Sequence, residues 1–70
     1  MRLSTRNQLT GVITEVTLGS VMATVKIALE PGGQTVVSSI TKEAVEELGL
    51  TVGQAATALI KSTEVTVGVE

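Results

Sequence analysis

Residues 20–29, SVMATVKIAL, have the alternating pattern that decides the fold. One face of an extended chain would carry apolar side chains only, those of Val21, Ala23, Val25, Ile27 and Leu29. The other face would carry Met22, Thr24, Lys26 and Ala28. A period of two with one apolar face predicts a half-buried β-strand.

The flanking segments extend this pattern in both directions. Residues 11–19, GVITEVTLG, also alternate, and Gly19 with Ser20 predicts a turn into the strand just described. In that segment Val12, Thr14, Val16 and Leu18 would share one face, opposite Ile13, Glu15 and Thr17. Residues 30–33, EPGG, predict a second turn because proline presets φ and glycine tolerates positive φ. A third strand, QTVVSSI, is expected over residues 34–40.

The periodicity changes in residues 41–50, TKEAVEELGL. Val45 and Leu48 stand three apart among strong helix formers, which predicts a short helix. Thr41 suits the N-cap position and Gly49 suits a left-handed helix end. Strand character returns in AATALIKS, residues 55–62, and in TEVTVGVE, residues 63–70.

This order of elements predicts an all-β fold with one short helix, in a single domain over residues 1–70. Five strands with a helix between the third and fourth are typical of a Greek-key barrel of the oligonucleotide/oligosaccharide-binding (OB) kind. A two-layer sandwich is the alternative.

The composition predicts assembly. Hydrophobic residues make up 43% of the 70 residues, yet Phe, Trp, Tyr and Cys are all absent. Small aliphatic side chains fill little volume, and chains of this size usually need reinforcement that here cannot come from disulfides. A homo-oligomer is therefore expected, and a small, weakly stable monomer is the alternative.

Several function classes are disfavoured by what the chain lacks. Without His or Cys, and with no Asp, acid–base catalysis and cation binding have few candidate residues. Lys61 and Ser62 are adjacent on a predicted strand, so they would point to opposite faces and could not form a catalytic dyad. The net charge of −2 and the absence of aromatic side chains oppose nucleic-acid binding. No segment has the ~20 apolar residues of a membrane span or the features of a secretory signal, so a cytoplasmic location is expected.

Hydrogen-bond donors gather at both chain ends, in STRNQ (residues 4–8) and KST (residues 61–63). Each stretch combines a cation with hydroxyl or amide groups and contains no carboxylate. Donors without acceptors suit a fully deprotonated tetrahedral oxyanion, to which the start of the helix at Thr41 can contribute. Alternatively, Arg6 and Lys61 are edge-strand charges that prevent aggregation. The residue types in these two stretches do not show which oxyanion would bind.

Taken together, these stretches resemble the molybdenum-pterin-binding (Mop) family, the molbindins, from about Leu3 to Val69. Three features carry the resemblance: the opening Ser-x-Arg-Asn-Gln-x-x-Gly, the helix that ends in Glu-Leu-Gly, and the late Lys-Ser-Thr before a valine-rich strand. The resemblance implies a five-stranded OB-like barrel, dimers formed by strand exchange, and a hexamer built as a trimer of dimers. It also implies that the subunit interfaces bind molybdate. We expect tungstate to compete for the same sites, and we expect no organic cofactor and no catalysis.

Ligand residues follow from the same resemblance, position by position. The expected molybdate-binding residues are Ser4, Arg6, Asn7, Thr41, Ala44, Lys61 and Ser62. Related sequences often carry Ser where this chain has Ala44, so that position is expected to contribute its backbone N–H only. Arg6 and Lys61 need not meet within one subunit, because neighbouring copies can complete a pocket.

The expected function is thus binding and storage of molybdate for molybdenum homeostasis. An oxyanion-sensing module that acts through a partner protein is the alternative, since domains of this type also occur fused to regulators and transporter ATPases. A nucleic-acid-binding barrel is a third alternative. It rests on fold analogy alone, and the missing aromatic side chains and the negative net charge oppose it.

Overall fold

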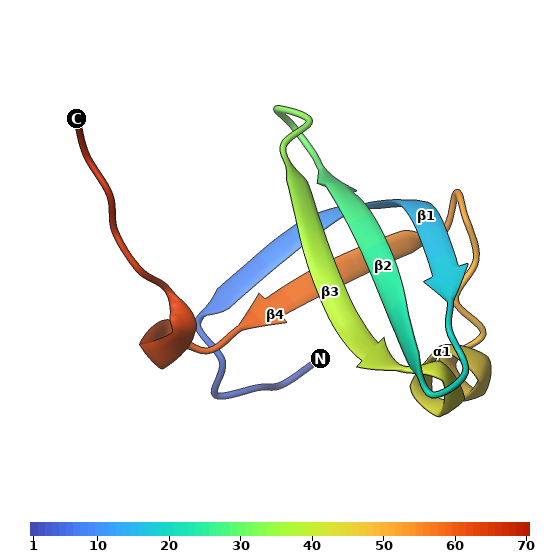
Figure 1. The fold of residues 1–70 in the computed structure, drawn as a ribbon. Helices are drawn as coiled ribbons and strands as arrows, with labels where there is room; N and C mark the ends of the chain where they lie inside the picture. The colour runs from blue at the N-terminus through green and yellow to red at the C-terminus, as the bar shows by residue number, and fades with distance from the viewer.

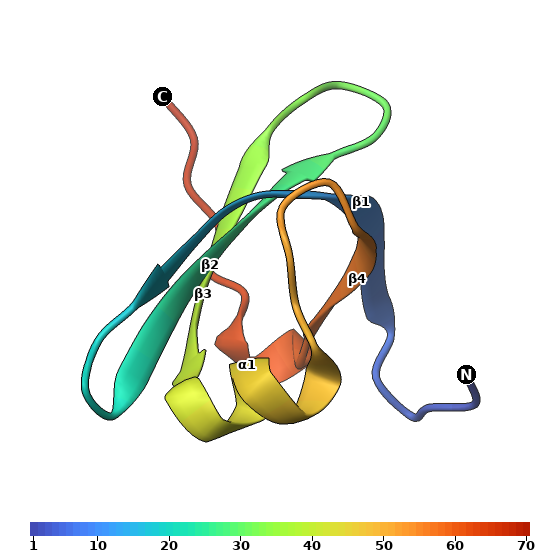
Figure 2. The same cartoon turned by 90° about the vertical axis from the view of Figure 1, so that its right-hand side faces the viewer.

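The computed structural model describes residues 1–70, which form one curled antiparallel sheet with a helix at one end (Figures 1 and 2). The sheet has four strands in the order β3-β2-β1-β4. The elements in chain order are β1 (Asn7–Leu18), β2 (Met22–Leu29), β3 (Thr35–Thr41), α1 (Lys42–Leu48), β4 (Ala55–Ile60) and the short 3-10 helix η1 (Ser62–Glu64). The mostly-β fold with one short helix is therefore confirmed, with four strands in the sheet.

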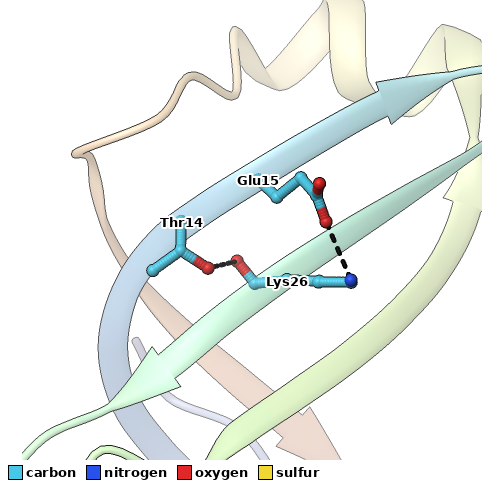
Figure 3. Close-up of polar contacts among 3 residues, drawn as sticks. All are labelled: Thr14, Glu15 and Lys26. Carbon is cyan, nitrogen blue, oxygen red and sulfur yellow. Dashed lines mark hydrogen bonds and ion pairs between the residues drawn. The ribbon is translucent and has the colours of Figure 1, made fainter.

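A β-bulge at Thr14 changes which face of β1 is buried. The β1–β2 register pairs Ile13 with Ile27 and then Glu15 with Lys26, so Thr14 is left over. Figure 3 shows that Lys26 contacts both Thr14 and Glu15. Its Nζ lies 2.9 Å from Glu15 Oε2, and its carbonyl oxygen accepts a hydrogen bond from Thr14 Oγ1 at 3.4 Å. A bulge shifts the alternation by one residue. The predicted faces of β1 were therefore wrong, because Ile13, at 1% exposure, and Val16, expected on the opposite face, both pack into the core.

Strand β1 bends because it pairs with different strands along its length. Residues 11–18 pair with β2, while residues 7–12 pair with β4. Gly11 belongs to both ladders, and a Cβ atom on it would lie 2.3 Å from the carbonyl oxygen of Ala28. Glycine thus permits the close approach of β1 and β2 at the bend, while the first part of β1 lies beside β4 (Figure 2).

The core is small and entirely aliphatic. It consists of Ile13, Ala23, Val25, Ile27, Val45 and Ala58. The predicted inward face of β2 is confirmed by three of these residues. Only seven of the 70 residues are buried, so the single chain leaves much of its apolar surface in contact with solvent.

Both helix caps agree with the prediction. Thr41 Oγ1 accepts a hydrogen bond from the backbone N–H of Ala44 at 3.0 Å, and Gly49 ends α1 with φ 62° and ψ 43°. Val45 is buried on the sheet, whereas Leu48 is 67% exposed. The helix therefore attaches through one apolar side chain, and its end remains open to solvent.

The predicted strand over residues 63–70 is not formed in the single chain. Strand β4 ends at Ile60, η1 turns the chain, and residues 65–70 have no regular structure. Figure 1 shows this tail, in red, leading away from the sheet. Val67 and Val69 are 89% and 93% exposed, so the valine alternation has no partner within the same chain. No helix in the structure is long and apolar enough to cross a membrane.

Candidate functional site

The two donor-rich stretches of the sequence meet at one end of the β1–β4 ladder. Asn7, the first residue of β1, pairs with Ile60, the last residue of β4. In an antiparallel pair the start of one strand lies beside the end of the other. Residues 4–6 and 61–63, which flank this pair, are therefore neighbours in space.

Together these residues line a cavity of about 240 Å³ that contains no hydrophobic side chain. Its lining consists of Ser4, Thr5, Arg6, Lys61, Ser62 and Thr63. Two cations and four hydroxyl groups thus surround a space many times larger than one water molecule needs. The structure brings Ser4, Arg6, Lys61 and Ser62 together within one chain, although the sequence argument did not require this.

No carboxylate balances the two cations in this cavity. The salt bridge of the structure joins Lys26 to Glu15 and involves neither Arg6 nor Lys61. Two uncompensated positive charges close to hydroxyl donors produce a positive potential that favours an anion. Because the cavity opens to solvent, a small ion can enter it directly.

Lys61 and Ser62 line the same cavity, so the prediction that they would point to opposite faces was wrong. The reason is local. The carbonyl oxygen of Lys61 accepts a hydrogen bond from the N–H of Glu64 at 2.9 Å, which begins the 3-10 turn of η1. Strand β4 ends at Ile60 and Ser62 is already the first residue of η1, so the alternation of a regular strand does not continue through this pair.

The amide side chains of Asn7 and Gln8 are bonded to backbone rather than directed into the cavity. Asn7 Nδ2 donates to the carbonyl oxygen of Ile60 at 3.0 Å, and Gln8 Nε2 donates to that of Thr5 at 2.8 Å. Neither residue lines the cavity. Asn7 therefore follows the candidate ligand Arg6 in the sequence, but its own side chain does not line the cavity.

Thr41 and Ala44 lie elsewhere in the same chain. Both belong to the start of α1, which Figure 1 shows at the opposite end of the molecule from the end of β4. The backbone N–H of Ala44, which we expected to be free for a ligand, instead donates to Thr41 Oγ1. The hydroxyl hydrogen of Thr41 is still available as a donor at this turn.

Thr5 and Thr63 line the cavity but were not among the candidate ligands. Their hydroxyl groups, and their positions next to Arg6 and Ser62 in the sequence, could have identified them as candidates. Sequence patterns also did not predict a second, mainly apolar groove of about 790 Å³ between β3 and β4. No group of three or more His, Cys, Asp or Glu residues that could hold a metal cation occurs in the structure.

Comparison with known proteins decides the family. Residues 3–67 match the model of the TOBE domain. The chain belongs to the TOBE domain family. This TOBE domain is also 47% identical to a probable molybdenum-pterin-binding protein of Haemophilus influenzae (strain ATCC 51907 / DSM 11121 / KW20 / Rd), over 70 residues that cover 100% of both chains. The resemblance to the molybdenum-pterin-binding family is thereby confirmed.

Solved structures share the fold of this TOBE domain. MopII from Clostridium pasteurianum superposes with a TM-score of 0.91 at 38% identity, covering 97% of this chain and 100% of the other. The cytoplasmic molybdate-binding protein ModG, solved with molybdate bound, superposes with a TM-score of 0.83 at 50% identity. That match covers 89% of this chain and 43% of ModG. ModG and the Haemophilus relative are both named for binding, which agrees with the expectation that this TOBE domain is not an enzyme.

Proposed function

We propose that this protein binds molybdate in the cavity between its two chain ends and serves to store the ion and control its level in the cytoplasm. The observation that carries the proposal is the composition of that cavity, with two cations, four hydroxyl groups and no carboxylate. Molybdate is bound in the related ModG. Ser4, Arg6, Lys61 and Ser62 are the proposed direct ligands.

The chemistry of the lining favours a dianion that carries no proton. Guanidinium and ammonium groups can only donate hydrogen bonds, and charge-assisted bonds are about twice as strong as neutral ones. Phosphate keeps a proton on part of its population near pH 7, and the cavity offers that proton only neutral hydroxyl oxygens and no carboxylate as hydrogen-bond acceptors. Tungstate has the same charge and shape as molybdate, so it competes for the same site.

The proposed assembly begins with closure of the sheet into a five-stranded OB-like barrel. Strands β3 and β4 are the two edges of the sheet, and the apolar groove of about 790 Å³ lies between them. Unpaired edges beside an apolar groove are suited to accept a further strand. The exposed tail, residues 65–70, carries Val65, Val67 and Val69 at alternate positions, as an inserted strand requires. Exchange of these tails between two copies would form a dimer.

Further association of dimers, as three pairs, would complete the binding site. Thr41 and Ala44 lie far from the cavity of their own chain, so they can serve only the cavity of a neighbouring copy. In this arrangement the Thr41 hydroxyl supplies a donor, and Ala44 lies beside it without a side-chain donor of its own. Residues 1–70 would act as one domain within a homohexamer.

Isothermal titration calorimetry with molybdate, tungstate, sulfate and phosphate tests the proposed function. We expect molybdate and tungstate to bind alike and both to bind more tightly than phosphate. Native mass spectrometry on the same samples reports the number of subunits and of bound ions together. Equal affinity for all four anions, or no binding at all, would contradict the proposal.

A further inference from the structure

Each wall of the cavity is tied to the sheet by an amide side chain that lies outside it. Asn7 Nδ2 donates to the carbonyl oxygen of Ile60, the residue before Lys61. Gln8 Nε2 donates to the carbonyl oxygen of Thr5, the residue before Arg6. In both cases the amide fixes the peptide group that leads into a cationic residue.

The hydrogen bond from Asn7 to Ile60 lies where the pairing of β1 with β4 ends. Asn7 and Ile60 form the last pair of the β1–β4 ladder, so beyond them no strand pairing holds the two walls together. The bond joins segments 53 residues apart in sequence and is partly buried, so water competes with it less than with an exposed bond. The Gln8 bond spans only three residues and is exposed, so it constrains one wall locally.

An electrostatic argument also favours such a tie whenever no anion is bound. Arg6 and Lys61 are like charges that line one space, and neither has a carboxylate partner. Their mutual repulsion favours separation of the walls whenever no anion is present. A neutral hydrogen bond between the walls opposes this separation without adding a negative charge that would compete with the ligand.

We propose that Asn7 is a positioning residue: it donates to the Ile60 carbonyl and thereby holds Lys61 close enough to Arg6 for both cations to bind one dianion. The inference rests on the proposed function, because it assigns Asn7 a role in that same site. It differs from direct ligation, in which the amide would donate to the oxyanion itself. A preformed site binds more tightly because less order must be imposed when the ligand arrives.

A double-mutant cycle separates positioning from direct ligation. Asn7→Ala is expected to weaken molybdate binding roughly fivefold, the usual effect of losing one neutral hydrogen bond. In a Lys61→Ala background the same change should weaken binding less than about twofold, because there is no longer an ammonium group to position. A direct ligand would lose the same factor in both backgrounds, and equal losses would overturn the proposal.

Gln54→Ala is the matched control. Gln54 also uses its side-chain amide in a local bond to backbone, accepting from the N–H of Thr51 at 3.0 Å, but it precedes β4 at the end away from the cavity. It should leave molybdate affinity unchanged. If Gln54→Ala and Asn7→Ala weaken binding equally, the effect of Asn7 is merely one of stability and the proposal fails.

Hydrogen–deuterium exchange without ligand keeps the inference testable by itself. The amides of Glu64 and Val65 close η1, and they should exchange faster in Asn7→Ala or in Asn7→Leu, which keeps a side chain of similar size without a donor and also serves if the alanine variant does not fold. Unchanged exchange would overturn the positioning role. If wild-type protein does not bind molybdate, the proposed function fails, and exchange still decides whether Asn7 holds the wall. If wild type binds, Arg6→Ala does not, and Asn7→Ala equals wild type, only this inference fails.

Discussion

Arg6 and Lys61 line one cavity, although they stand near opposite ends of the chain. The pairing of β1 with β4 brings them together, because Arg6 precedes the first residue of one strand and Lys61 follows the last residue of the other. The cationic pair is therefore a property of the folded subunit. In the proposed assembly, neighbouring copies would add only the groups near Thr41, which lie away from the cavity in each chain.

Replacing either cation should weaken molybdate binding strongly. Hydrogen bonds to charged groups contribute about 1.5–3 kcal/mol, so Arg6→Ala and Lys61→Ala should each raise the dissociation constant by tenfold or more. Titration calorimetry measures the change. Arg2→Ala is the matched control, since this Arg does not line the cavity and its loss changes net charge equally. An Arg6→Ala variant with wild-type affinity would remove Arg6 from the site.

The bend in β1 should depend on Gly11. An added Cβ would lie 2.3 Å from the carbonyl oxygen and 2.9 Å from the carbonyl carbon of Ala28, and backbone atoms in a ladder cannot retreat as a flexible side chain can. Gly11→Ala should therefore lower the free energy of unfolding by about 3 kcal/mol, near the upper end for overpacking.

Urea denaturation at a fixed protein concentration checks the Gly11 prediction, with Gly68→Ala as its control. A Cβ at Gly68 would meet nothing within 4 Å, so that variant should unfold like wild type. If Gly11→Ala also unfolds like wild type, the approach of β1 to β2 is more adaptable than the structure indicates.

Strand positions were predictable from the sequence, whereas the bulge was not. The alternation in residues 20–29 located β2 and its buried residues, because both faces of a regular strand obey the same period. In β1 the extra residue at Thr14 reverses that period, and no local residue preference marks its place. Burial of Ile13 therefore became evident only from the register with β2.

The helix start should depend on the hydroxyl group of Thr41. Its Oγ1 accepts from the N–H of Ala44, which otherwise lacks a partner in the first helical turn. Thr41→Ala should lower the free energy of unfolding by about 1 kcal/mol, the usual cost of a lost N-cap. Thr41→Ser keeps the acceptor and should stay close to wild type in the same denaturation measurement. Equal stability of all three proteins would show that the cap contributes nothing.

For the site, the sequence indicated the chemistry but not the geometry. Residue types alone showed that the stretches STRNQ (residues 4–8) and KST (residues 61–63) are rich in donors and contain no carboxylate. Their convergence depends on which residues begin β1 and end β4, and strand boundaries are set by tertiary pairing. The 3-10 turn that begins at Ser62 also ends the strand alternation here, and Lys61 and Ser62 line the same cavity.

The C-terminal tail should control assembly through its alternate valines. In an inserted strand, Val65, Val67 and Val69 would face the apolar groove, and burial of each would contribute about 1.5–3 kcal/mol. Val67→Lys would instead bury an ammonium group and should shift the protein toward monomers in size-exclusion chromatography and native mass spectrometry. Thr66→Lys adds the same charge on the opposite face and should preserve the oligomer. If both variants assemble like wild type, the tail does not occupy the groove and the dimer forms through another surface.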